Sequence, residues 1–257
     1  MARLAALPLL RDLSLTTNGL LLAEHAAALR SAGLRRVNVS LDTLDPATFR
    51  RLTRRSGLDA VLAGLAEARR CGLDPIKVNA VVIRGVNDHE IPDLVSFCRD
   101  RGFPLRFIEV MDAGNANGWR PDLLVPAEEI LGRIRERFQL RPAGRAEPDA
   151  PAVAYRIEGG GEVGVIASVT EPFCGECTRA RLTADGRLVT CLFAEGGTDL
   201  RGPLRAGADD EELARLLHGA WSARRDRFSE ERAEALRAGA PYDPHARRKF
   251  EMIALGG

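Results

Sequence analysis

The sequence has 257 residues, of which 45% are hydrophobic, enough for one large domain or a domain with a smaller companion. Its 37 lysines and arginines balance 36 acidic residues, so a broad basic surface for nucleic acid is not expected. No apolar run reaches the roughly 18 residues of a transmembrane helix, and five cysteines do not suggest a disulfide framework. We therefore expect a cytoplasmic protein without a membrane or nucleic-acid partner.

Short β-branched runs alternate with amphipathic segments in the first half of the chain. They predict strands at residues 13–18, 36–42, 76–83 and 105–111. Asp45 followed by Pro46 is typical of a helix start, and Gly33, Gly72 and Gly102 stand where helices should end. Strands separated by helices predict a parallel sheet, either open or part of a (β/α) barrel.

A second region is expected after the predicted helix at 126–138. Residues 141–151 are rich in Pro, Ala and Gly and read as a linker, after which the βα rhythm stops. Residues 153–160 and 161–168 predict an antiparallel pair, and Ala184-Asp185-Gly186 predicts a later hairpin. We expect domains at 1–140 and 141–257.

Three cysteines in the second region indicate a metal site. Cys174 and Cys177 form a C-x-x-C pair in a loop, and Cys191 follows at the end of the predicted hairpin. Cys71 and Cys98 lie on apolar helix faces and suit buried small side chains instead. A redox dithiol is a weaker interpretation, because such pairs sit where a strand leads into a helix. The fourth metal ligand remains open at this point.

Two arginines stand directly beyond the cysteine pair. Arg179 and Arg181 are two residues apart on a predicted strand, so their side chains share one face. Two guanidiniums can bind a polyphosphate, although surface arginines are common. A phosphate-bearing substrate is therefore predicted.

Several segments together resemble the GTP 3′,8-cyclases, radical S-adenosylmethionine enzymes that begin molybdenum cofactor biosynthesis. The resemblance extends from residue 1 to residue 257 and is carried by TTNG (16–19), VNVSLD (37–42), IKVNAVVIRGVND (76–88), LRFIEVM (105–111), FCGECTRARLTADGRLVTCLF (173–193) and the final LGG. It implies a partial parallel (β/α) barrel of the radical SAM type, followed by a smaller C-terminal α+β region with an iron–sulfur site. The implied lyase activity rearranges GTP to 3′,8-cyclo-7,8-dihydro-GTP.

The resemblance also implies roles for individual residues. Cys174, Cys177 and Cys191 would hold a 4Fe–4S cluster whose open iron meets the guanine of GTP, so the substrate itself is the fourth ligand. The implied GTP contacts are Thr16, Lys77, Arg179, the backbone of Ala180, and Arg181. No catalytic proton donor is implied.

Ser40 and Met111 match positions that contact S-adenosylmethionine in the family, and Gly256 and Gly257 match a tail that enters the active site. Without the resemblance, Thr16 would be an ordinary strand-end residue, Met111 a core residue and the Gly-Gly end a frayed terminus.

One family feature is missing from the sequence. The family has a C-x-x-x-C-x-x-C loop for a second 4Fe–4S cluster and then G-G-E-P, and neither occurs here. We expect a chain truncated at its N-terminus or started at an internal methionine, inactive as given because S-adenosylmethionine cleavage needs that cluster. The implied pathway partner is cyclic pyranopterin monophosphate synthase, and a homodimer is left open.

Two other functions remain open. The first is a truncated, catalytically incompetent module that binds GTP or zinc, with a histidine such as His245 as the fourth zinc ligand. The second is a related radical enzyme that modifies a peptide. Iron content and colour after anaerobic reconstitution separate the first, and competition between GTP and a peptide separates the second.

Overall fold

The structure is a computed structural model that describes residues 1–255. The chain forms two compact units, each described by itself below. The first contains Met1–Val110 and Asp122–Ala167, and the second contains Met111–Pro121 and the chain from Ser168 on. The predicted domain boundary after residue 140 therefore differs from the boundaries of these units. The division into domains at 1–140 and 141–257 remains a prediction.

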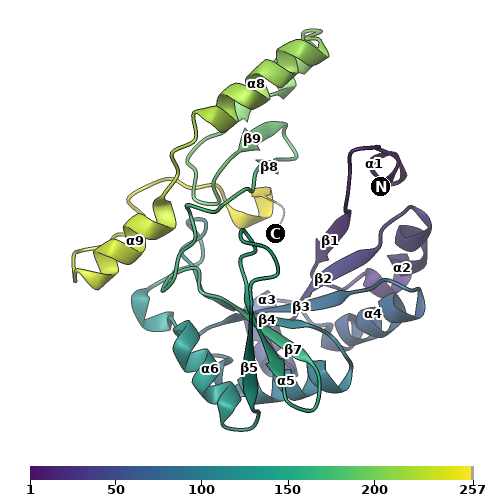
Figure 1. Cartoon of the computed structure of the whole chain (residues 1–257), viewed down its shortest axis with the longest axis vertical. Helices are drawn as coiled ribbons and strands as arrows, with labels where there is room; N and C mark the ends of the chain where they lie inside the picture. The colour runs from purple at the N-terminus through teal and green to yellow at the C-terminus, as the bar shows by residue number, and fades with distance from the viewer. Residues whose placement is uncertain (256–257) are drawn as a thin grey trace. The chain divides into compact units, whose positions relative to one another are not determined.

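The first unit is built on a seven-stranded sheet with the order β1-β2-β3-β4-β7-β6-β5 (Figure 1). β1 to β4 and β7 are parallel, whereas β6 and β5 are antiparallel to their neighbours. The bounds are β1 Ser14–Thr17, β2 Arg36–Ser40, β3 Ile76–Val82, β4 Leu105–Glu109, β5 Leu140–Gly144, β6 Val153–Ile157 and β7 Glu162–Ile166. The four predicted strands and the mostly parallel sheet are confirmed, consistent with a barrel of the radical SAM type.

Helices separate the parallel strands, as the alternation predicted. Their bounds are α1 Ala2–Ala5, α2 Leu22–Ser31, α3 Pro46–Thr53, α4 Leu58–Arg70, α5 Ile91–Asp100 and α6 Ala127–Arg135, with 3-10 turns at Asp88–Glu90 and Pro121–Leu123. The predicted start of α3 is confirmed, because the Asp45 carboxylate accepts from the Thr48 amide at 2.7 Å. The main hydrophobic core lies in this unit and includes Val39, Val78 and Phe107.

The predicted linker at 141–151 is wrong in its first part. Residues Leu140–Gly144 form β5 and pair with β6, and the register shifts between Pro142 and Gly144. Gly144 has φ +78°, a conformation that glycine adopts without the steric cost of a side chain. An irregular edge strand therefore tolerates the Pro and Gly that read as linker composition.

The second unit has a three-stranded antiparallel sheet of β8 Arg181–Leu182, β9 Arg187–Val189 and β10 Thr198–Asp199. The predicted hairpin is confirmed between β8 and β9, with Gly186 at φ +82° in its turn. The helices are α7 Arg201–Arg205, α8 Asp210–Ser222 and α9 Phe228–Arg237, and a 3-10 turn covers Met252–Leu255.

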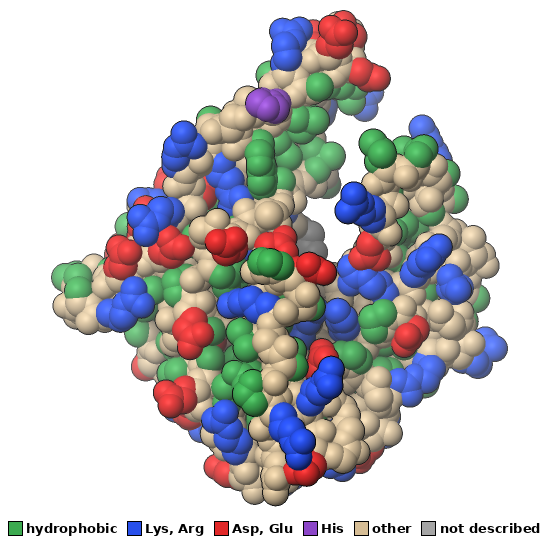
Figure 2. Space-filling model, viewed as in Figure 1, with side chains coloured by type: hydrophobic (Ala, Val, Ile, Leu, Met, Phe, Trp, Pro, Cys, Tyr) green, Lys and Arg blue, Asp and Glu red, His purple; other side chains and the backbone are tan. Residues whose placement is uncertain are grey.

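Basic and acidic side chains are interspersed over the face shown in Figure 2, in keeping with the formal charge of +1. Within residues 1–255, no helix combines the length and the apolar character needed to span a bilayer.

Candidate functional site

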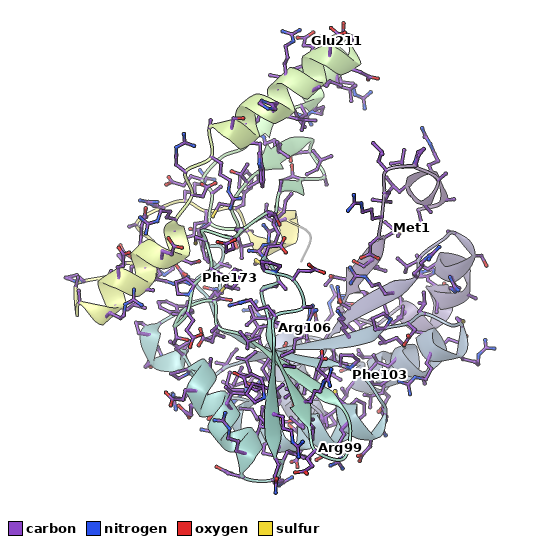
Figure 3. All side chains as sticks on the ribbon, in the orientation of Figure 1. Met1, Arg99, Phe103, Arg106, Phe173 and Glu211 are labelled. Carbon is purple, nitrogen blue, oxygen red and sulfur yellow. The ribbon has the colours of Figure 1, made fainter. Side chains whose placement is uncertain are left out.

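Polar side chains form two rows across β1 to β4. In one row Thr16 pairs with Asn38, which pairs with Lys77. In the next row Ser40 pairs with Asn79, which pairs with Arg106 (labelled in Figure 3). The residues between them along the strands are the buried ones that pack into the core. Parallel strands are usually apolar on both faces, so this polar face indicates a surface for a ligand.

Positive charge gathers on this face. Burial lowers the pKa of Lys77, and the charges of Arg106 and Arg36 lower it further. Burial also lowers the pKa of Arg106, again with a contribution from Arg36. Mutual repulsion of this kind favours an anionic ligand such as a phosphate. Sequence reasoning found Lys77 but missed Arg106, which strict alternation in β4 could have placed on the same face.

Two amide oxygens on this face lack hydrogen-bond donors among the described residues. They are Oδ1 of Asn38 and Oδ1 of Asn79, and both are buried. The Asn38 amide nitrogen donates to Thr16 Oγ1 at 3.3 Å. A buried acceptor without a donor is costly, so both carboxamides fit a ligand with N–H or O–H groups.

Ser40 lines a pocket at the carboxyl ends of β1 and β2. Its volume is about 140 Å³, and Asn18, Asp42 and Phe49 also line it. Burial raises the pKa of Asp42, although the Val81 amide donates to its carboxylate at 2.8 Å. In open α/β sheets, the carboxyl ends of the strands are the usual place for ligands.

Cys174 and Cys177 lie in one tight turn of the second unit. The Cys177 amide donates to the Cys174 carbonyl at 3.1 Å, and the Arg179 guanidinium donates to the Cys177 thiol sulfur at 3.0 Å. Burial would raise the pKa of Cys177, but hydrogen bonds and charge from Arg179 and Arg224 hold it below its ordinary value. Such an environment favours the thiolate, which is the form that binds metals.

Cys191 stands just after β9. Burial raises its pKa, and the negative charges of Asp226, Cys174 and Cys177 raise it further. The three thiols are therefore close enough to influence one another. No group of three or more His, Cys, Asp or Glu in residues 1–255 has metal-binding geometry, so ligation by these cysteines stays a prediction. Their chemistry nevertheless fits an iron–sulfur cluster, which is held by cysteine thiolates.

The other two cysteines are free thiols in the first unit. Cys98 is 1% exposed within the core, and burial raises its pKa to about 12. Cys71 is half-buried and packs against the same core. Both agree with the expectation that they are small packing residues.

Arg179 and Arg181 flank exposed Ala180 in the second unit. The predicted strand begins only at Arg181, so Arg179 precedes it. The Arg179 guanidinium lies 4.9 Å from the centre of the Phe173 ring. Burial lowers the pKa of Arg181, and the charge of Arg179 lowers it further, so the two guanidiniums lie near each other. Together they offer donors to an anion.

The remaining candidate site residues are Met111, His245, Gly256 and Gly257. Met111 is half-buried, and its carbonyl accepts from the Asn117 side chain at 2.8 Å. His245 is exposed and belongs to no metal-binding group among residues 1–255. Gly256 and Gly257 lie outside the described residues.

Each half of the chain matches a known protein family. Residues 1–98 match the Radical SAM superfamily, and residues 103–230 match Molybdenum Cofactor Synthesis C. A GTP 3′,8-cyclase of Acidothermus cellulolyticus is 52% identical over 100% of this chain and 76% of its own length. One of Xanthomonas campestris pv. campestris is 46% identical over 99% of this chain and 73% of its own length. The chain therefore belongs to the GTP 3′,8-cyclase family.

Proposed function

We propose that this chain binds GTP for its rearrangement to 3′,8-cyclo-7,8-dihydro-GTP, the first step of molybdopterin biosynthesis. The observation that carries the proposal is the polar face of the parallel sheet. There Lys77 and Arg106 repel one another, and the amide oxygens of Asn38 and Asn79 have no hydrogen-bond donor within residues 1–255. A nucleoside triphosphate supplies both: its phosphates are the anion, and its ribose hydroxyls are hydrogen-bond donors.

The proposed GTP contacts are Thr16, Lys77, Arg179, Ala180 and Arg181. We add Arg106, Asn38 and Asn79 to this proposal because they lie on the same face of the sheet as Thr16 and Lys77. Lys77 and the arginines would bind phosphate oxygens, whereas the asparagines would accept from hydroxyl or amino groups. Holding both ends of the nucleotide fixes its reactive atoms relative to each other.

Ser40 and Met111 are the proposed contacts to S-adenosylmethionine, and Cys174, Cys177 and Cys191 would hold the 4Fe–4S cluster. When bound, these groups supply radical chemistry and electron transfer. We place Gly256 and Gly257 at the active site as well. A second 4Fe–4S cluster needs a C-x-x-x-C-x-x-C segment, which the printed sequence does not contain. Binding is therefore proposed for these 257 residues and turnover for a chain that includes such a segment.

GTP is the proposed small-molecule partner, and the product would pass to cyclic pyranopterin monophosphate synthase. We place these reactions in the cytoplasm, without nucleic-acid or membrane partners. A radical lyase of this kind needs no such partner, because substrate and product are small molecules.

The test is anaerobic reconstitution followed by measurement of iron content and GTP affinity. Wild type should take up about four irons per chain and bind GTP, and Cys191→Ser should lose both. Cys98→Ser, at a buried thiol outside the site, is the matched control and should keep both. Stoichiometric zinc without colour would contradict the proposal and support a zinc-binding module.

A further inference from the structure

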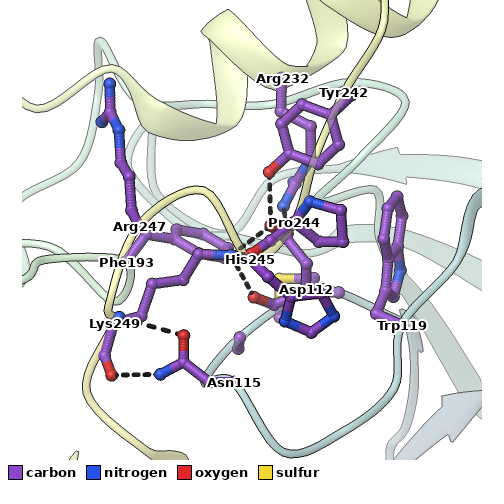
Figure 4. Close-up of polar contacts among 12 residues, drawn as sticks. Asp112, Asn115, Trp119, Phe193, Arg232, Tyr242, Pro244, His245, Arg247 and Lys249 are labelled. Atoms are coloured by element: carbon purple, nitrogen blue, oxygen red, sulfur yellow. Dashed lines mark hydrogen bonds and ion pairs between the residues drawn. The ribbon is translucent and has the colours of Figure 1, made fainter.

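A buried carboxylate lies at the centre of the second unit. Asp112, 1% exposed, meets two equally buried cations, Arg232 and Lys249 (Figure 4). The Lys249 ammonium is 2.6 Å from Asp112 Oδ2, and the Arg232 guanidinium donates to Oδ1. The Tyr242 hydroxyl also donates to Oδ2. Burial would raise the pKa of Asp112, but these partners hold it below its ordinary value, so the carboxylate is ionised.

The three N–H donors of the Lys249 ammonium all have acceptors here. The ammonium donates to the carbonyls of Asp112 and Pro244, at 2.8 Å each, besides the Asp112 carboxylate. A buried ion pair adds little net stability over an apolar pair of the same volume, but it accepts only one geometry. Such a pair is suited to fixing a position.

The segment fixed in this way is the C-terminal strap, which we define as residues 242–252. Asn115 makes four hydrogen bonds with it. Its side-chain nitrogen donates to the Lys249 carbonyl at 2.7 Å and to Glu251 Oε1 at 3.3 Å, its backbone amide donates to Glu251 Oε1 at 2.9 Å, and its side-chain oxygen accepts from the Lys249 amide at 3.3 Å. The strap then reaches a second loop, because the Phe250 amide donates to the Ala194 carbonyl at 3.2 Å. Ala194 lies three residues after Cys191.

Aromatic contacts join the same cations to residues 190–196, which we call the Cys191 loop. Phe193 stacks on Phe228 with ring centres 4.6 Å apart, and the Lys249 ammonium lies 5.7 Å and 5.1 Å from the two rings. The Arg232 guanidinium lies 5.1 Å from Phe193. The Phe193 amide in turn donates to the Cys191 sulfur at 3.5 Å. Asp112 is thus connected to Cys191 through the two cations that it pairs with and through the ring of Phe193.

We propose that Asp112 is a positioning residue for Cys191, acting through Lys249, Phe193 and the C-terminal strap. The proposal rests on the proposed function only in taking Cys191 as a cluster ligand. It makes the strap part of the cluster site, because fastening the strap holds the loop that presents the third thiol.

The decisive variant is Lys249→Met, which removes the strap's buried cation and leaves Asp112 paired with Arg232. Arg248→Met, at the exposed neighbouring position, is the matched control. In the apo chain, Lys249→Met should speed hydrogen exchange in residues 190–196 and 242–252 by about tenfold, with α8 and residues 174–178 unchanged. The control should match wild type.

The second readout is the rate at which a chelator removes iron from the reconstituted chain. Lys249→Met should take up as much iron as wild type but lose it about three to ten times faster, since one of three ligands is less well held. Asp112→Asn should do the same, and combining it with Lys249→Met should add less than the sum of the two effects, as expected for residues acting together.

Unchanged exchange at 190–196 in Lys249→Met would overturn the proposal. Equal acceleration throughout the second unit would also overturn it, because that result indicates a general stabilising role. A wild-type chain that takes up no iron would instead refute the proposed function, and the exchange comparison would still decide whether Asp112 holds the Cys191 loop.

Discussion

The half-buried Lys77 predicts how GTP binding depends on pH. Its pKa is lowered mainly by burial and then by two neighbouring arginines. Below that pKa the ammonium attracts phosphate, and above it the attraction is lost. GTP affinity should therefore fall with rising pH, beginning below the ordinary lysine value of about 10.4. Titration calorimetry from about pH 7 to 10 measures this decline.

Lys77→Met should weaken binding and abolish the decline. Arg106 keeps its charge throughout this range, so residual binding should remain. An unchanged pH profile in Lys77→Met would show that Lys77 does not contact the phosphates.

Arg181 tests the proposed phosphate contacts of the second unit. Arg181→Ala should weaken GTP binding by about 1.5–3 kcal/mol without changing iron content, because a guanidinium bound to phosphate is lost but no thiolate. Arg187→Ala, on the neighbouring strand β9 and exposed, should have no effect. Loss of iron with intact GTP affinity in Arg181→Ala would show that this arginine supports the cluster instead.

At the scale of elements, the crossing of α2 and α4 depends on a glycine. A Cβ on Gly64 would lie 2.8 Å from the Gly19 carbonyl oxygen and 3.0 Å from Leu22 Cβ. Gly64→Ala should therefore lower the free energy of unfolding by about 1–3 kcal/mol, although alanine is the better helix former. Denaturant titration measures the change.

Gly132 in α6 is the matched comparison. A Cβ there would meet no heavy atom within 4 Å, so Gly132→Ala should raise the free energy of unfolding by about 0.5–1 kcal/mol. The opposite signs are the essential result. Stabilisation by both substitutions would mean that the helices are further apart than the structure places them.

At the scale of the whole molecule, the two units differ in what stabilises them. The main hydrophobic core lies in the first unit, whereas the second unit has a smaller set of buried apolar residues. Removing iron from the reconstituted chain should therefore speed hydrogen exchange in the second unit and leave β1 to β4 unchanged, since metal binding stabilises a small unit most. Equal acceleration in both units would contradict this expectation.

The sequence by itself determined the parallel strands, the start of α3, the hairpin at Gly186 and the cysteine pair. These are local features, because alternation, capping and turn chemistry act within a few residues. The spacing of Arg179 and Arg181 beside the cysteine pair also predicted an anion site, and the family resemblance added Thr16, Ser40 and Lys77.

Only the tertiary structure decided which distant residues meet. β7 joins β4 with Leu105 opposite Val163, so a pair predicted to belong to the second region completes the main sheet. Arg106 became a member of the polar face through its partner Asn79. Asp112 and Lys249 are 137 positions apart, and each would read as an exposed charge on its own. Local periodicity cannot specify such contacts, because a buried ion pair depends on geometry that exists only once both segments are folded.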